Sequence, residues 1–271
     1  MLATAPPGAA PALERAACSY TSCYCEENAL LLSKRLAQAG AAPADRLYVV
    51  FVTNRLRQTP LWFQRAGRDE DGLVVWDYHV FVVEAPHGAL RCARVWDLDT
   101  RLPFPCPLPD YAAATLPPVR EEYDRVYRAV PAPHLWRHFA SDRSHMRAPG
   151  GGWAAPPPPY PPFVAESDGC ANRLQAYLDV AEAYPRGGGP GDGSDDDGSG
   201  GGSGGDGGSG SGDGGEADVA GAVEEGGANG GGRGSGGGDG VRGVGSGGGV
   251  PRAEMGRVMR QGELLRAFGA A

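Results

Sequence analysis

One block of the sequence, residues 187–249, limits how much of this 271-residue chain can fold. It is dominated by Gly, Ser and Asp and has almost no bulky apolar side chain. Such a composition cannot bury enough apolar surface to repay the entropy of ordering the chain. Globular composition resumes after the block, and loop-closure cost grows slowly with length. We therefore predict a disordered insert within one domain, 18–186 plus 250–271, after a flexible N-terminus at 1–17.

The acidic character of the chain comes from the same block. The whole chain has a net charge of −8, whereas the block holds 11 acidic residues and two arginines, which leaves about +1 for the remainder. No basic patch favours nucleic-acid binding, and no apolar run is long enough to span a membrane. Six cysteines without an evident disulfide framework or secretion signal are typical of a reducing compartment. We expect a soluble monomer in the cytoplasm, with the nucleus as a second compartment.

A cysteine motif, CYCEEN at residues 23–28, stands before a predicted helix. Apolar residues then recur at helical spacing, and Gly40 stands where a helix of this length would end. Cys25 therefore lies at a helix N-terminus, where the helix dipole favours the nucleophilic thiolate. The neighbouring Glu26 and Glu27 raise a cysteine pKa, so we expect a cationic partner elsewhere in the fold. The alternative is that the cysteines are small apolar core residues or part of a metal site.

Two stretches rich in β-formers, residues 73–83 and 90–98, predict a β-hairpin. If three residues centred on Gly88 form its loop, residue 79 lies directly opposite residue 97. His79 and Asp97 then share a face with Cβ atoms about 5 Å apart, within reach of a hydrogen bond. The alternative is a hairpin whose polar face is simply exposed to water.

The remaining ordered segments are expected to complete the domain. They are strands at 47–52, 60–64 and 256–259, short helices at 172–183 and 263–268, and a segment at 121–130 that fits a helix or a strand.

A cysteine at a helix N-terminus, followed by a histidine and an aspartate on neighbouring strands, is typical of papain-like and transglutaminase-like cysteine hydrolases. We therefore expect an α+β fold in which the helix carrying Cys25 packs on an antiparallel sheet. In such a site His79 takes the thiol proton, and Asp97 fixes the tautomer and orientation of the histidine.

At this point the sequence resembles a specific family, protein N-terminal glutamine amidohydrolase. The resemblance covers residues 18–184 and 256–269, and it lies in segments that follow one another in the family's order: 23–28, 75–80, 97–100 with 102–105, 139–146, and the proline-rich run through Tyr160. It implies a triad of Cys25, His79 and Asp97, and so selects Cys25 over Cys23 and Asp97 over Asp99. Members of the family are expected to lack the insert.

The resemblance implies hydrolysis of the side-chain amide of an N-terminal glutamine of a protein through a thioester, giving N-terminal glutamate and ammonia. The product would feed arginylation in the N-degron pathway. This chemistry requires no metal and no cofactor. Further residues expected to bind the substrate are Tyr24, Glu26, Trp76, Tyr78 and Asp142. The residues that could recognise its α-ammonium group, with capping or loop-fixing roles as the alternative, are Glu26, Glu27, Asp77, Asp142 and His145.

Two other functions fit the same residues. One is a papain-like peptidase or a transglutaminase with a different acyl substrate. The other is a non-catalytic adaptor whose proline run, residues 156–162, binds a partner domain, with cysteines that are structural or bound to zinc. The same run also fits a segment anchored on the domain's own core.

Overall fold

The predicted apolar strand forms β1 (Leu47–Thr53), which lies inside a six-stranded antiparallel sheet. Its side chains alternate between two buried clusters, with Phe51 in one and Val50 in the other, because successive residues of a strand point to opposite faces. The computed structural model describes residues 13–88, 92–184, 250 and 252–269. The predicted insert at 187–249 lies outside these residues.

The strand order is β6-β5-β4-β1-β7-β8, and a separate pair is formed by β2 and β3. The other strands are β2 (Thr59–Leu61), β3 (Val74–Trp76), β4 (His79–Glu84), β5 (Arg94–Trp96), β6 (Cys106–Pro107), β7 (Val126–Pro131) and β8 (Arg257–Arg260).

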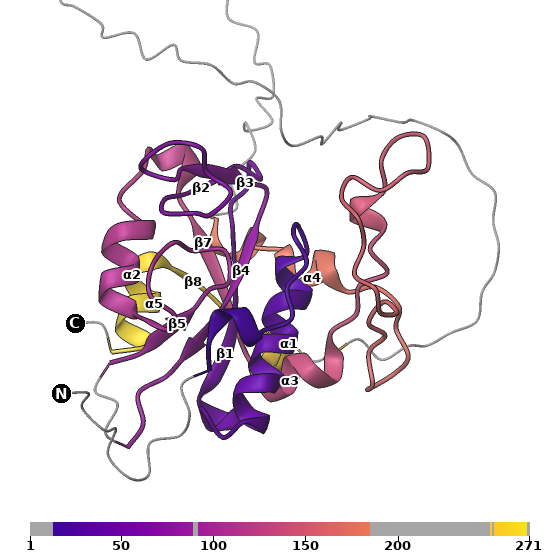
Figure 1. The fold of residues 1–271 in the computed structure, drawn as a ribbon, viewed down its shortest axis with the longest axis horizontal. Coiled ribbons are helices and arrows are strands. Elements are labelled where there is room, and N and C mark those ends of the chain that lie inside the picture. Colours follow the sequence, from indigo (N-terminus) through magenta and orange to yellow (C-terminus); the bar gives the residue numbers. More distant parts are fainter. Residues whose placement is uncertain (1–12, 89–91, 185–249, 251, 270–271) are drawn as a thin grey trace, which may run out of the picture. The chain divides into compact units, whose positions relative to one another are not determined.

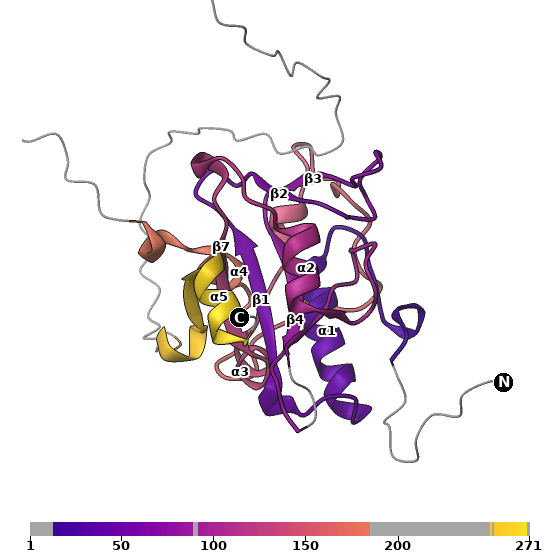
Figure 2. The same ribbon diagram turned by 90° about the vertical axis from the view of Figure 1, so that its left-hand side faces the viewer.

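Helices cover both faces of the large sheet, as Figures 1 and 2 show. One face carries α1 (Cys25–Gln38), α3 (Ala132–His138) and α4 (Leu174–Leu178); the other carries α2 (Leu108–Thr115) and α5 (Gln261–Ala267). Short 3-10 turns lie at Arg15–Ala17, Ala44–Arg46, Glu121–Tyr123, Ser144–Met146, Ala181–Ala183 and Arg252–Met255. The predicted α+β class, with the Cys25 helix on an antiparallel sheet, is confirmed.

The predicted hairpin register is wrong by two residues. Val83 pairs with Val95, whereas a three-residue loop would have placed it opposite residue 93. The connection between β4 and β5 is longer than that loop, although Gly88 does have the expected positive φ of 52°. An even shift keeps every side chain on its original face, so His79 and Asp97 become diagonal neighbours on the same side.

The stretch predicted as a single strand at 73–83 is two strands. The break falls at Asp77, whose Oδ1 accepts the backbone N–H of Tyr78 at 2.8 Å. Before the break, β3 pairs with β2; after it, β4 pairs with β1. His79 is therefore the first residue of its strand, at the end of the sheet where the chain turns.

Two helices were not predicted. Both α2 and α3 carry a proline in the first turn, at Pro109 and Pro133. Proline is favourable there because the first helical N–H groups have no intrahelical acceptor. The segment 121–130 is a 3-10 turn followed by β7, and the helix expected at 172–183 is confined to α4.

The chain after the insert completes the edge of the sheet. β8 pairs with β7, α5 buries Leu264 in the second core cluster, and Phe268, which follows α5, is buried in the same cluster. Gly256 enters this strand with φ 83°, and a Cβ there would lie 2.4 Å from the Ala129 carbonyl oxygen. Only glycine allows the two strands to approach so closely.

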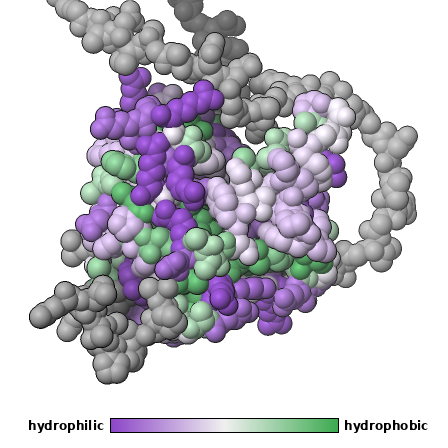
Figure 3. Space-filling model, in the orientation of Figure 1, coloured by the Kyte–Doolittle hydropathy of each residue, from purple (hydrophilic) through white to green (hydrophobic). Residues whose placement is uncertain are grey.

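The outer surface is mixed in character. On the face drawn in Figure 3, hydrophobic residues show through between groups of hydrophilic ones. Scattered exposed apolar side chains are normal on a folded domain and need no function of their own. No helix among the described residues is long and apolar enough to cross a membrane.

Candidate active site

Cys25 is the first residue of α1, as predicted. The loop before the helix is fixed by Asn28, whose side-chain amide donates to the Thr21 carbonyl at 2.8 Å and accepts the Thr21 N–H at 2.9 Å. Cys25 is buried, with 9% of its surface exposed, whereas Cys23 is exposed and has a left-handed φ of 68°. The turn at Cys23 therefore directs the chain so that Cys25 enters the domain.

His79 and Asp97 form a fully buried pair. His79 Nε2 donates to Asp97 Oδ1 at 3.1 Å, and the same oxygen accepts the backbone N–H of Asp99 at 2.9 Å. The other oxygen, Oδ2, accepts the hydroxyl of Tyr111 at 2.8 Å. Because Nε2 carries the proton, Nδ1 of the neutral ring is an acceptor, and this buried atom has no hydrogen-bond partner in the described part of the chain.

The two groups shift each other's pKa. Burial alone lowers the pKa of His79, but the Asp97 carboxylate, with a smaller contribution from Asp99, outweighs burial and leaves that pKa raised. Burial alone raises the pKa of Asp97, but His79, the Asp99 N–H and the Tyr111 hydroxyl leave it lowered. Asp97 therefore stabilises the imidazolium that forms when a histidine base accepts a proton, relative to a histidine that is buried without a carboxylate.

Trp76 packs against one face of the His79 imidazole. Its ring stacks on that of His79, with centroids 5.4 Å apart and an interplanar angle of 21°. Trp76 was predicted as a substrate-binding residue; the structure places it against the histidine, with its indole Nε1 buried and without a hydrogen-bond partner among the described residues.

The Cys25 thiol is directed at Glu26. Sγ donates to Glu26 Oε2 at 3.7 Å, so the structure does not bring Cys25 and His79 into a hydrogen bond. Burial, followed by the Glu26 carboxylate, raises the pKa of Cys25 well above its ordinary value. Burial therefore opposes the effect expected from the helix N-terminus and favours the neutral thiol in the free protein.

Arg143 supplies a cationic partner for one of the two glutamates, Glu27. Its Nε and one terminal nitrogen donate to the two oxygens of Glu27 at 2.8 and 2.9 Å in a buried bidentate pair. Another nitrogen donates to the Tyr160 carbonyl at 3.0 Å, and the Tyr24 hydroxyl donates to the Ala155 carbonyl at 3.2 Å. The proline-rich run is thus anchored to the first turn of α1, as one of its two interpretations expected.

Replacing Glu27 with glutamine is expected to lower the free energy of unfolding by about 3 kcal/mol, since it leaves the buried Arg143 charge unpaired. Urea denaturation followed by tryptophan fluorescence measures the change. Glu166→Gln is the matched control. It removes only an exposed carboxylate, which lies 3.9 Å from Lys34, a residue of α1 like Glu27. A Glu27 variant as stable as this control would show that the pair does not hold the helix in place.

Asp142 does not join these residues. It is exposed, and its Oδ1 accepts the Ser144 N–H at 2.9 Å and the Asn172 side-chain amide at 2.7 Å. These contacts fix its own loop. Tyr78, by contrast, lies in the site and donates its hydroxyl to Glu26 Oε2 at 3.0 Å.

Sequence reasoning missed Tyr111 and Arg143. Tyr111 lies on α2, a helix that the proline pattern concealed. Arg143 lies in the segment 139–146, which was noted only for its resemblance to a family. The sequence offered one indication of Arg143: a buried glutamate at the start of the helix, such as Glu27, requires a cation beside it.

The central part of the chain matches a known family. A family model described as N-terminal glutamine amidase matches residues 20–193, which include Cys25, His79 and Asp97. The chain belongs to the N-terminal glutamine amidase family. The predicted resemblance is therefore confirmed, and β8 and α5 of this family member lie beyond the matched segment.

Curated relatives carry the name protein N-terminal glutamine amidohydrolase. A relative from Arabidopsis thaliana is 46% identical over 169 residues, which is 60% of this chain and 76% of the relative. Relatives from Drosophila melanogaster and Drosophila mojavensis are each 44% identical over 154 residues, which is 56% of this chain and 74% of each relative.

The donor set of this family member includes one group with metal-ligand geometry. Ligand atoms of His79, Asp97 and Asp99 all lie within 4.8 Å of one another. However, both oxygens of Asp97 accept hydrogen bonds, and Asp99 Oδ1 accepts the Tyr20 hydroxyl at 2.5 Å. Because protein donors already occupy these oxygens, we interpret the group as a hydrogen-bonded network.

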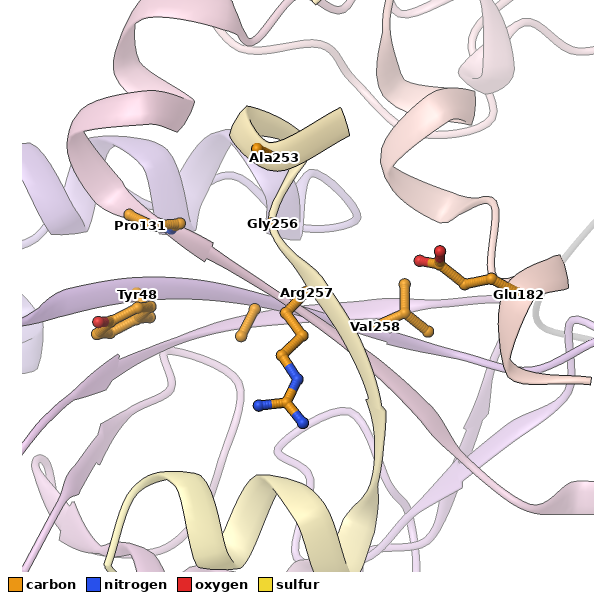
Figure 4. A pocket seen from close by; sticks show the side chains of 8 residues that line it. Tyr48, Pro131, Glu182, Ala253, Gly256, Arg257 and Val258 are labelled. Atoms are coloured by element: carbon orange, nitrogen blue, oxygen red, sulfur yellow. The ribbon is translucent and has the colours of Figure 1, made fainter. Parts of the chain in front are cut away.

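A pocket of about 420 Å³ lies elsewhere in the domain, between the β7–β8 edge and the 3-10 turns at 181–183 and 252–255 (Figure 4). Tyr48, Pro131, Gly256 and Arg257 are among its lining residues, and none of the predicted site residues lines it. In this member of the amidase family, the pocket is therefore separate from Cys25, His79 and Asp97.

Proposed function

We propose that this chain hydrolyses the side-chain amide of glutamine at the N-terminus of proteins and peptides, releasing ammonia and leaving N-terminal glutamate. Membership of the N-terminal glutamine amidase family supports the choice of substrate. The observation that carries the chemistry is the buried hydrogen bond from His79 Nε2 to Asp97, which leaves Nδ1 as an unpartnered base. Cys25, on the neighbouring helix, lines a narrow void together with Val80, the residue after His79.

The first half of the proposed reaction forms a thioester. His79 Nδ1 takes the thiol proton, and the Cys25 sulfur attacks the amide carbon of the substrate. The negative oxygen of the tetrahedral intermediate accepts the Cys25 backbone N–H at the start of α1, together with a second donor. His79 then gives its proton to the departing nitrogen, and the C–N bond breaks as ammonia leaves.

The second half restores the enzyme. His79 takes a proton from a water molecule, and the resulting hydroxide adds to the thioester carbon. The C–S bond breaks, the sulfur recovers its proton from His79, and the acyl group leaves as a carboxylic acid that releases its remaining proton to solvent to give the carboxylate of glutamate. Asp97 holds the imidazole in the required tautomer and stabilises the imidazolium in both halves.

We propose two wider relationships. The order Cys, His, Asp, with the cysteine on a helix and the histidine on a strand of the sheet, supports a core related to papain-like and transglutaminase-like hydrolases. The product, an N-terminal glutamate, would serve as a substrate for arginylation in the N-degron pathway. We propose the cytoplasm as its location, with the nucleus as a second compartment.

The test is ammonia release from four matched peptides, followed by mass spectrometry. We expect a Gln-initiated peptide to be converted from amide to acid without cleavage or crosslinking. N-terminal acetylation of the same peptide should lower kcat/KM by about 100-fold or more, because we expect the site to bind the free α-amine. Replacing the N-terminal glutamine with asparagine should lower kcat/KM by about 100-fold, since the shorter side chain holds the amide farther from the sulfur.

The fourth peptide has glutamine only at an internal position. Comparable rates on this peptide would contradict the proposed function and favour a transglutaminase-like activity. Cleavage of the peptide backbone would favour a peptidase.

A further inference from the structure

Glu26 combines complete burial with an incomplete set of hydrogen bonds. Its exposed fraction is 0%, and its Oε2 is occupied by the Tyr78 hydroxyl at 3.0 Å and the Cys25 thiol at 3.7 Å. Its other oxygen, Oε1, is buried and accepts no hydrogen bond from the described residues. His145 Nε2 lies 3.5 Å from Oε1 without forming one. A buried carboxylate oxygen without a donor is costly, so this atom is suited to a donor that arrives with a ligand.

The nearby groups do not neutralise this oxygen. Because the Tyr78 hydroxyl gives its hydrogen to Glu26, the 3.2 Å contact between Tyr78 and His145 requires a proton on His145 Nε2 that points at the Tyr78 oxygen. Burial lowers the pKa of His145, so the neutral ring is favoured. Among the described residues, the Glu26 carboxylate therefore has no cationic partner of the kind that Arg143 gives to Glu27.

The other carboxylates around Cys25 have their partners. Both oxygens of Glu27 accept hydrogen bonds from Arg143, and both oxygens of Asp97 are occupied as well. Asp77 is exposed and accepts the Tyr78 N–H. Among the described carboxylates, Glu26 is the one with a buried oxygen left open.

We infer that Glu26 Oε1 binds the free α-ammonium group of the substrate and thereby restricts the reaction to N-terminal residues. This inference rests on the proposed function, since it names the group that would recognise one end of its substrate. The amide carbon and the α-nitrogen of a glutamine lie at most about 5 Å apart. A glutamine whose amide carbon approaches Cys25 Sγ to about 3 Å therefore has its ammonium within reach of the adjacent residue.

The charge of Glu26 agrees with this role. Burial, with a further contribution from Glu27, raises the pKa of Glu26 to about 7, so a protonated form is well populated near neutral pH. A bound ammonium stabilises the carboxylate form. Binding of the correct substrate thus restores the charge of a group that burial tends to neutralise.

The test compares a Gln-initiated peptide with its des-amino counterpart, in which hydrogen replaces the α-amino group. The wild-type protein should prefer the peptide with the amine by about 100-fold or more in kcat/KM. Glu26→Gln should lower this preference to less than about tenfold, because any effect of the substitution on the Cys25 thiol is common to both peptides and cancels in the ratio of their kcat/KM values. Glu166→Gln, the surface control, should keep the wild-type preference.

Binding gives a readout that does not depend on turnover. In calorimetry, adding Glu26→Gln to the inactive Cys25→Ala variant should weaken binding of the amine peptide by about 30-fold or more and leave the des-amino peptide unchanged. An equal loss for both peptides, in turnover or in binding, would overturn the inference and assign Glu26 to the thiol or to the fold. A wild-type protein that releases no ammonia from any Gln-initiated peptide would instead contradict the proposed function itself.

Discussion

Replacing Cys25 with alanine is expected to abolish ammonia release from a Gln-initiated peptide, with a loss of about 10⁵-fold or more, because no other group supplies the acyl-accepting sulfur. Cys23→Ala is expected to keep most of the activity. The two cysteines are two residues apart, but Cys23 is exposed at the left-handed turn, whereas Cys25 begins α1 and contacts the buried Glu26.

Ammonia release measures the activity of both variants, and circular dichroism checks that both are folded. Alkylation followed by peptide mapping then identifies the sulfur that becomes modified. A Cys23→Ala protein that is folded, alkylated at Cys25 and yet inactive would show that the nucleophile has been assigned to the wrong cysteine.

Replacing Asp97 with asparagine is expected to lower kcat by about 10³- to 10⁴-fold while the fold is retained. The amide oxygen can still accept from Tyr111 or the Asp99 N–H, but an amide nitrogen facing His79 donates to Nε2. The proton of the ring then moves to Nδ1, and the base that faces the thiol is lost. The pKa of His79 should also fall, because the carboxylate that opposes the effect of burial has been removed.

Titration of the His79 ring by NMR measures that fall in pKa directly, and denaturation separates it from a loss of stability. Tyr111→Phe provides the graded comparison, since it removes one hydrogen bond to Asp97 and leaves the charge in place. Full activity of Asp97→Asn together with a large loss from Asp99→Asn would overturn the assignment of Asp97.

The pairing of His79 with Asp97 could be predicted from the sequence because it depends on the face of each strand more than on the register. The predicted loop was too short, and the ladder is displaced by two residues. An even displacement preserves the face, so the two side chains still meet. A displacement by one residue would have placed the two side chains on opposite faces. Nothing in the sequence around Gly88 specified whether the displacement would be odd or even.

Other parts of the site depend on contacts between distant segments. The pair between Glu27 and Arg143 joins residues 116 positions apart, and no periodicity links them. Tyr111 lies on α2, a helix that was not predicted and that carries Pro109 in its first turn. The neutral state of the Cys25 thiol was also beyond sequence reasoning, since it follows from burial that only the packed domain establishes.

The C-terminal segment has a consequence for how the domain is held together. Residues 257–260 join the sheet through backbone pairing with β7, and α5 contributes side chains to the same core as β1. These contacts are non-covalent, and they resemble the association of a peptide with an open sheet edge. A break in the covalent chain between residues 184 and 250 is therefore expected to leave the last strand as a separate peptide that binds β7 with its own dissociation constant.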